Sequence, residues 1–147
     1  MFIYRKLKDI VSVKNSVLTI GSFDGLHRGH QEIIGKVTNI ANAIGEKSVV
    51  VTFDPHPKQI LSNYSSNFEI LLSQQKKELL LEKLGVDITV VIPFDLEFSK
   101  KSALSFVDEI ICTYFTPQKI IIGYDHHFGF KREGNGTFLE KISDQYN

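Results

Sequence analysis

Short apolar runs alternate along this chain with longer segments whose apolar residues recur at helical spacing. The apolar runs are rich in β-branched residues and end at glycine, proline or aspartate. They cover residues 17–21, 48–53, 88–92 and 119–123. Continuous apolar runs of this length predict strands that are buried on both faces, as in a parallel sheet.

The segments between these runs predict helices. Residues 31–44 carry an apolar stripe and end at Gly45. Ser73 can cap a helix that continues to residue 84, and Ser102 can cap another that continues to residue 114. The stripe of that last helix contains Ala103, Phe106, Val107, Ile110, Ile111 and Tyr114. We expect a polar surface crossing over 62–67 and a short helix near 137–143.

Alternating strands and helices predict an α/β fold, a Rossmann-like parallel sheet with helices on both faces. In such folds, ligands bind beyond the carboxyl ends of the strands. Three unusual polar segments follow predicted strands, at 27–30, 54–57 and 124–130. Together they contain all five histidines, which are His27, His30, His56, His126 and His127. The sequence therefore predicts a ligand site at this edge of the sheet.

The first polar segment joins a glycine turn to a predicted helix. His27 and His30 would stand on one face of the helix start, where unpaired N–H groups attract anions. This context favours contact with phosphate. The alternative interpretation is a glycine turn with two solvated histidines. Neither Gly-x-x-x-x-Gly-Lys-Ser/Thr nor Gly-x-Gly-x-x-Gly occurs in the chain, so those fingerprints do not explain the site.

The other two segments have different chemistry. Pro55 and Pro57 stiffen the loop around His56, which suits a ligand wall or, equally, a rigid strand exit. In the third segment a planar ligand could stack on Tyr124, Phe128 or Phe130, with Lys131 and Arg132 near phosphate. The alternative there is an exposed glycine hairpin with solvated charges. The sequence thus leaves both segments open to a structural explanation.

Composition narrows the class of protein. The 147 residues fit one domain, and 42% hydrophobic with 23% charged residues is ordinary for a globular chain. Zero formal net charge gives no overall attraction to nucleic acid or to a membrane. The N-terminal residues lack a signal-peptide core, and no apolar run could span a bilayer. We expect a cytoplasmic protein.

The number and spacing of the cysteine and histidine residues do not favour a metal site formed by protein side chains. The single Cys112 excludes an intrachain disulfide and a multi-cysteine zinc site, and its context predicts a core or half-buried thiol. The clustered histidines make zinc the obvious rival to phosphate. However, no His-Glu-x-x-His motif appears and no thiolates assist. We therefore predict no protein metal ligand.

Four segments in order resemble a known family. They are 21–30 with its His-x-Gly-His motif, 52–57, 84–95 and 123–129. His-x-Gly-His resembles the signature of the nucleotidyltransferase superfamily. All four together resemble the FMN adenylyltransferase (FAD synthetase) module of prokaryotic bifunctional riboflavin kinase/FAD synthetase. The similarity runs from about residue 16 to residue 136.

The resemblance implies a nucleotidyltransferase fold. It also implies an enzyme, a nucleotidyltransferase that forms FAD and pyrophosphate from FMN and ATP, with Mg²⁺. It implies that His27 and His30 contact the ATP phosphates. The nucleotide side would be lined by Gly21, Ser22, Phe23, Asp24 and Gly29. The flavin side and neighbouring wall would be formed by Asp54, Pro55, His56, Pro57, Asp125 and Phe128. Such a reaction needs no serine or cysteine nucleophile, because the FMN phosphate is itself anionic.

One departure from the family pattern bears on activity. The family carries a Ser-Ser-Thr-x-x-Arg-like segment that supports the ATP phosphates, and nothing comparable appears before Asn147. We also expect the riboflavin kinase domain, a partner in the full-length parent, to be absent from residues 1–147. We therefore expect 1–147 to be a nucleotidyltransferase domain truncated at its C-terminus. The alternatives are transfer of an adenylyl or cytidylyl group to another small phosphate, or a nucleotide- or flavin-binding module without turnover.

Overall fold

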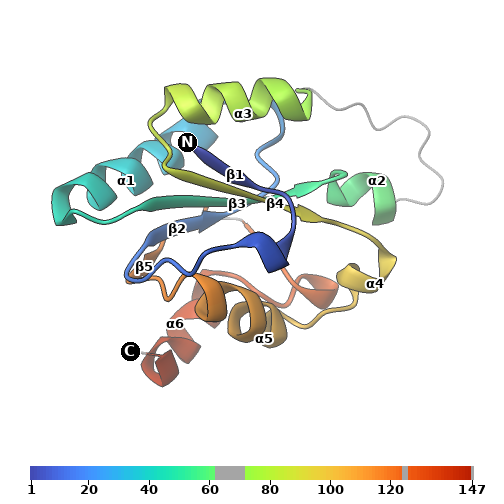
Figure 1. Cartoon of the computed structure of the whole chain (residues 1–147). Helices are drawn as coiled ribbons and strands as arrows, with labels where there is room; N and C mark the ends of the chain where they lie inside the picture. Colours follow the sequence, from blue (N-terminus) through green and yellow to red (C-terminus); the bar gives the residue numbers. More distant parts are fainter. Residues whose placement is uncertain (62–71, 124–125, 147) are drawn as a thin grey trace.

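A parallel five-stranded sheet forms the centre of the structure (Figure 1). The computed structural model describes residues 1–61, 72–123 and 126–146. The strands lie in the order β1-β4-β3-β2-β5, and every neighbouring pair is parallel. Their bounds are Phe2–Tyr4 for β1, Val17–Ile20 for β2, Ser48–Asp54 for β3, Ile88–Pro93 for β4 and Lys119–Ile120 for β5. This sheet confirms the predicted α/β class.

The central strands are buried on both faces, as their apolar runs predict. All four residues of β2 and the first six of β3 are buried. Side chains of a strand alternate between its faces. Val49 and Val51 accordingly join one hydrophobic cluster, and Val50 joins another. The sheet therefore needs a covering layer on each side.

Helices supply both layers (Figure 1). Two helices cover one face, α1 (Arg28–Ile44) and α3 (Gln74–Lys83). The other face is covered by α4 (Leu96–Ser99), α5 (Ala103–Phe106) with the π-helical turn Val107–Cys112, and α6 (Gly136–Tyr146). A short helix, α2 (Pro57–Leu61), follows the carboxyl end of β3. Three 3₁₀ turns complete the described elements, at Leu7–Asp9, Asp24–Leu26 and Phe130–Arg132.

The predicted caps of the long helices are confirmed. The Ser73 hydroxyl accepts a hydrogen bond from the Lys76 N–H at 3.3 Å, and the Ser102 hydroxyl accepts one from the Ser105 N–H at 3.0 Å. Gly45 ends α1 with a φ of 72°, a left-handed conformation that glycine adopts without strain. These local signals therefore fix where the covering helices begin and end.

Several predicted boundaries were wrong. The helix α1 begins at Arg28 rather than at residue 31, and β5 ends at Ile120 rather than at residue 123. The helix predicted over 102–114 is confirmed, since residues 103–114 are helical throughout, with a π-helical turn at Val107–Cys112. The helix expected near 137–143 extends over Gly136–Tyr146. The surface crossing expected at 62–67 lies outside the described residues.

The sequence patterns also missed three short elements. The strand β1 has only three residues, is followed by Arg5 and Lys6, and pairs with β4 alone at the edge of the sheet. The helices α2 and α4 have five and four residues. A helix of that length is too short to display a periodic apolar stripe. These elements form through their tertiary contacts.

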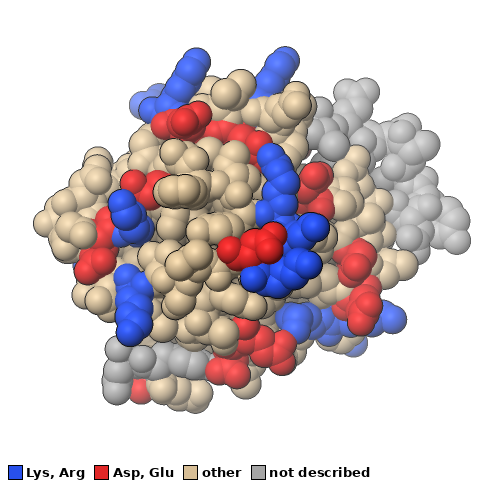
Figure 2. All heavy atoms as spheres, in the orientation of Figure 1, with Lys and Arg blue, Asp and Glu red and all other residues tan. Residues whose placement is uncertain are grey.

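The surface and the lone thiol agree with the composition. Positive and negative side chains are interspersed on the face shown in Figure 2. Within 1–61, 72–123 and 126–146, no helix has the length and apolar character needed to cross a membrane. Cys112 is half-buried, as predicted, and burial raises the pKa of its thiol.

Candidate functional site

The turn after β2 is tight and positions the first polar segment. The Gly21 N–H donates to the Val51 carbonyl at 3.0 Å, which extends the pairing of β2 with β3 by one residue. The chain then turns through left-handed conformations at Phe23, Gly25 and Leu26, with φ of 50°, 76° and 40°. A Cβ at position 21 would lie 2.9 Å from the Phe23 ring, so this turn requires glycine there.

His27 and His30 lie together at the start of α1. Their rings stack with centroids 3.6 Å apart and an interplanar angle of 25°. His27 is exposed and His30 is half-buried, with its ring edge-on to Phe23 at 5.5 Å. A Cβ at Gly29 would lie 3.2 Å from the His27 ring, so glycine leaves room for this stack. The predicted placement of both imidazoles on one face of a helix start is confirmed.

The second polar segment borders the first. The Thr52 hydroxyl donates to the Ser22 carbonyl at 3.3 Å, which joins the end of β3 to the turn after β2. Asp54 is exposed at the end of β3, and half-buried His56 follows it. The His56 Nδ1 accepts a hydrogen bond from the Lys58 N–H at 3.1 Å. Burial lowers the pKa of His56, and the negative charge of Asp24 opposes this effect. Two predicted segments therefore meet at one edge.

Gly123, just before the third segment, lies beside the first turns of α1. A Cβ at Gly123 would lie 3.3 Å from Ile33, on the first turns of α1, and 3.7 Å from His126. Beyond this point the chain packs against α5 instead. The Phe130 N–H donates to the Lys101 carbonyl, and Glu133 accepts from the Ala103 N–H. The predicted site residue Asp125 lies outside the described residues.

Phe128 lies deeper than a stacking platform would. It is 6% exposed, and its ring packs 5.7 Å from Phe106 and 6.2 Å from Phe138. Its backbone pairs with Gly134, whose missing side chain leaves room for the ring. Phe130 is more accessible, at 41% exposed. The role of Phe128 in a flavin-side wall stays a prediction, while its packing in the core is observed.

Sequence patterns missed two buried charges on α3. Lys77 and Glu78 are 6% and 7% exposed. The Lys77 ammonium donates to the Ser22 carbonyl at 3.0 Å and to the Thr52 hydroxyl at 3.1 Å. A signal existed, because Lys77 precedes the fully buried Leu81 by four residues and so shares its helical face. The structure thus adds Lys77 to the turn that positions the histidines.

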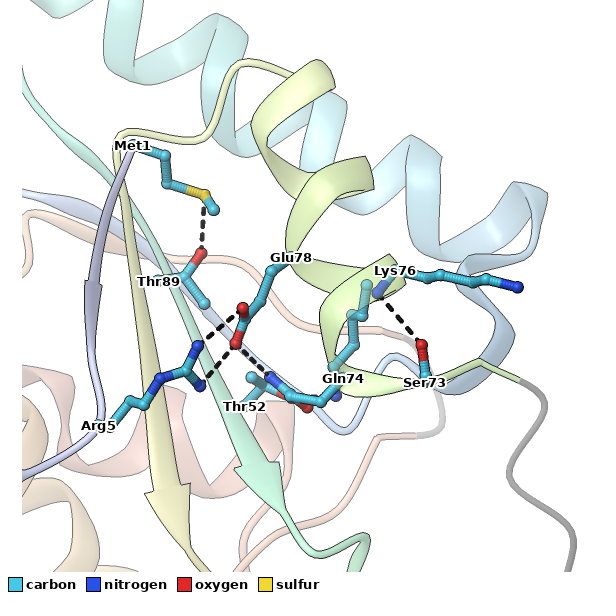
Figure 3. Close-up of polar contacts among 9 residues, drawn as sticks. Met1, Arg5, Thr52, Ser73, Gln74, Lys76, Glu78 and Thr89 are labelled. Atoms are coloured by element: carbon cyan, nitrogen blue, oxygen red, sulfur yellow. Dashed lines mark hydrogen bonds and ion pairs between the residues drawn. The ribbon is translucent and has the colours of Figure 1, made fainter.

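Glu78 holds the first strand to α3. Both terminal nitrogens of the Arg5 guanidinium donate to its carboxylate, at 2.8 and 2.9 Å, and the Gln74 amide donates at 3.1 Å (Figure 3). Burial alone would raise the pKa of Glu78, but these hydrogen bonds and the Arg5 charge lower it overall. This network connects β1 to the same helix that carries Lys77.

An open hollow of about 640 Å³ lies beyond the carboxyl end of β4. Its lining comes from Pro93, Asp95, Glu97, Phe98, Lys100, Lys101, Ser102 and Ser105. None of these belongs to the three polar segments. In the described part of the chain, no group of three or more histidine, cysteine or acidic side chains could hold a metal ion.

Comparisons with known proteins agree with this architecture. The chain is 38% identical over 130 residues to a bifunctional riboflavin kinase/FMN adenylyltransferase of Listeria monocytogenes, covering 88% of this chain and 41% of the relative. It is 37% identical over 133 residues to the protein of that name in Buchnera aphidicola, covering 90% and 42%. The chain thus spans about two fifths of the length of these relatives.

A solved structure and a family model extend the match. The crystal structure titled as a macrolide-efflux protein from Streptococcus pneumoniae superposes with a TM-score of 0.81 at 26% identity, covering all of this chain and 56% of that one. The model of the FAD synthetase family matches residues 9–147. This match covers four of the five strands and all of the residues placed around His27 and His30. The chain belongs to the FAD synthetase family.

Proposed function

We propose that this chain catalyses adenylyl transfer from ATP to FMN, giving FAD and pyrophosphate. The stacked His27–His30 pair at the start of α1 carries the proposal. Helix starts offer unpaired N–H groups and positive partial charge to an anion. Two imidazoles placed there can donate hydrogen bonds to the oxygens of the ATP phosphates as charge moves during transfer. Family membership supplies the identity of the reaction.

The reaction balances without a nucleophilic side chain. An oxygen of the FMN phosphate attacks the α-phosphorus of ATP and forms the new P–O bond. The bond from the α-phosphorus to the bridging oxygen breaks, and pyrophosphate leaves. The attacking phosphate is already largely anionic near neutral pH, so no base is needed to generate it. The protein has to align two anions and offset their charge.

Each segment has a proposed place in this reaction. The turn after β2 would line the nucleotide side through Gly21, Ser22, Phe23, Asp24 and Gly29, which its position beside the histidines supports. The end of β3 would contribute the flavin side through Asp54, Pro55, His56 and Pro57. Asp125 and Phe128 complete the proposed wall. Hydrogen bonding between Thr52 and Ser22 brings the two sides together.

Mg²⁺ is proposed as the accompanying cation. This ion is commonly held by one or two carboxylates together with substrate phosphates. The substrate phosphates would be its main ligands here, in keeping with the prediction of no protein metal ligand. When bound, it would neutralise phosphate charge.

The cellular setting follows from the proposed reaction. The relatives' names join riboflavin kinase to FMN adenylyltransferase. We propose that a riboflavin kinase domain supplies FMN in the full-length parent, with both activities in the cytoplasm. The partners of this chain would then be small molecules, ATP and FMN, rather than nucleic acid or a membrane.

The direct test incubates the purified chain with FMN, ATP and Mg²⁺ and follows FAD by chromatography. Asn39→Ala is the matched control for histidine substitutions, because Asn39 is exposed on the same helix, away from its start. FAD formation that depends on His27 and His30 supports the proposal. Competition by nicotinamide mononucleotide, phosphopantetheine and glycerol phosphate checks the acceptor. Faster transfer to one of these compounds would mean that it, rather than FMN, is the acceptor. Tight ATP binding without turnover would indicate a binding module.

A further inference from the structure

One buried ammonium connects three elements at the candidate site. Lys77, on α3, donates to the Ser22 carbonyl after β2 and to the Thr52 hydroxyl on β3. Thr52 also donates to the same Ser22 carbonyl. The three groups close a small hydrogen-bonded ring of side chains and backbone. The turn after β2 is therefore attached to α3 and β3 at a single carbonyl.

Packing alone does not account for a lysine at this position. Lys77 is 6% exposed, and burying an ammonium is unfavourable. Burial lowers the pKa of Lys77, while the charges of Asp54 and Asp24 oppose that effect. A well-packed apolar side chain often gives equal or greater stability at a buried charged position. The lysine therefore calls for an explanation other than stability.

The contacts of Lys77 lead directly to the histidines. Ser22 precedes Phe23, which begins the left-handed turn with a φ of 50°. The Phe23 ring in turn contacts His30 edge-on, and His30 stacks on His27. Holding the Ser22 carbonyl thus fixes the residue against which the imidazole pair packs. The same ammonium also offsets two carboxylates, Asp24 and Asp54, at the edge where two anionic substrates would bind.

We propose that Lys77 is a positioning residue for adenylyl transfer, which holds the turn over 21–26 in the shape that places His27 and His30. This inference rests on the proposed function and deepens it. Lys77 is not a catalytic residue in this proposal, because its two observed hydrogen bonds go to the protein itself. Its charge also lowers the repulsion that Asp24 and Asp54 would exert on phosphate.

The test compares Lys77→Met with Lys76→Met. The two lysines are neighbours on α3, but Lys76 is exposed and its side chain points away from the Arg5–Glu78 network (Figure 3). In Lys77→Met we expect kcat and kcat/KM for FAD formation to fall together by at least about tenfold, a difference of about 1.4 kcal/mol in the transition state. Lys76→Met should match the wild type. Lys77→Arg, which keeps the charge, should recover part of the loss.

Hydrogen exchange gives a readout that does not depend on turnover. The backbone amides of residues 21–30 should exchange faster in Lys77→Met than in the wild type. In Lys76→Met their exchange rates should equal those of the wild type. Thr52→Val keeps the lysine charge and removes the bridging hydroxyl, so it gives a second variant if Lys77→Met does not fold. It should show faster exchange over 21–26 and a smaller loss of kcat.

Two results would overturn the positioning role. One is that Lys77→Met folds and has the same kcat as Lys76→Met. The other is that hydrogen exchange of the amides of 21–30 does not change in Lys77→Met. A purely structural role would lower the melting temperature and leave kcat of the folded enzyme unchanged. If the wild-type chain formed no FAD, the proposed function would fail, and the exchange comparison would still decide whether Lys77 holds the turn.

Discussion

In the proposed reaction His27 and His30 would act together on the ATP phosphates, since their rings stack 3.6 Å apart at the same helix start. Replacing either one by alanine should cost roughly 2–4 kcal/mol of transition-state stabilisation, the range seen when one preorganised donor is lost. The double variant should lose less than the sum of the two, since residues that act as a unit are not additive. Steady-state FAD formation by both single variants and the double variant measures this coupling.

The control for this comparison is the free energy of unfolding of each variant. His27 is exposed, so His27→Ala should leave the free energy of unfolding within about 0.5 kcal/mol of the wild type. Full additivity of the two activity losses would contradict a shared target. Equal kcat in all three variants and the wild type would remove both histidines from the mechanism.

Alanine substitutions at Gly21 and at Gly35 should change the free energy of unfolding in opposite directions. At Gly21 the added Cβ would lie 2.9 Å from the Phe23 ring, which is itself 4% exposed and has little room to move. Gly21→Ala should therefore destabilise the fold by about 1–3 kcal/mol and lower activity.

At Gly35, inside α1, nothing lies within 4 Å of the added Cβ. Gly35→Ala should stabilise the fold by about 0.5–1 kcal/mol. Urea unfolding measures both, and equal effects would contradict the tight turn.

At the scale of elements, the Arg5–Glu78 network predicts a pH dependence. The folded-state pKa of Glu78 is lowered below its usual value. Its contribution to stability is therefore complete above the unfolded pKa and is lost as pH falls through the folded pKa. Glu78→Gln should cost about 1.5–3 kcal/mol near neutral pH, because hydrogen bonds to a charged group are removed. The cost should shrink on acidification below the ordinary carboxyl pKa.

Urea unfolding of wild type and Glu78→Gln between neutral and acidic pH measures this dependence. Glu140→Gln is the control, since Glu140 is exposed on α6 and lies on another element than the Arg5–Glu78 network. A constant difference between wild type and Glu78→Gln at every pH would show that the network does not titrate with folding.

For the molecule as a whole, local patterns predicted the sheet and the edge at which the polar segments at 27–30 and 54–57 meet. The apolar runs became β2, β3 and β4 because strands buried on both faces show continuous hydrophobicity. The position of the histidines followed from the strand–turn–helix order. Lys77 was missed because α3 carries charged residues on several faces, and only tertiary contact shows which one is buried. The burial of Phe128 likewise depends on α5 and α6 packing around it.

A site built on phosphate contacts should also change the stability of the whole domain when it is filled. Ligand at about 100 times its Kd stabilises a folded protein by about 2.7 kcal/mol. For a domain of this size, that corresponds to a rise in Tm of about 5–10 °C. ATP with Mg²⁺ should produce this rise, and adenosine at equal concentration should produce much less, because it lacks the phosphates that the helix start and the histidines would hold.

The contribution of the histidines separates phosphate recognition from recognition of the base. In the variant carrying both His27→Ala and His30→Ala, the Tm rise with ATP should fall toward the value with adenosine, whereas Asn39→Ala should keep the full rise. Differential scanning fluorimetry of the wild type and both variants, each with ATP and with adenosine, measures these shifts without requiring turnover. Equal stabilisation of the wild type by ATP and adenosine would mean that the phosphates are not held at the start of α1. The stacked imidazoles would then need another role in the fold.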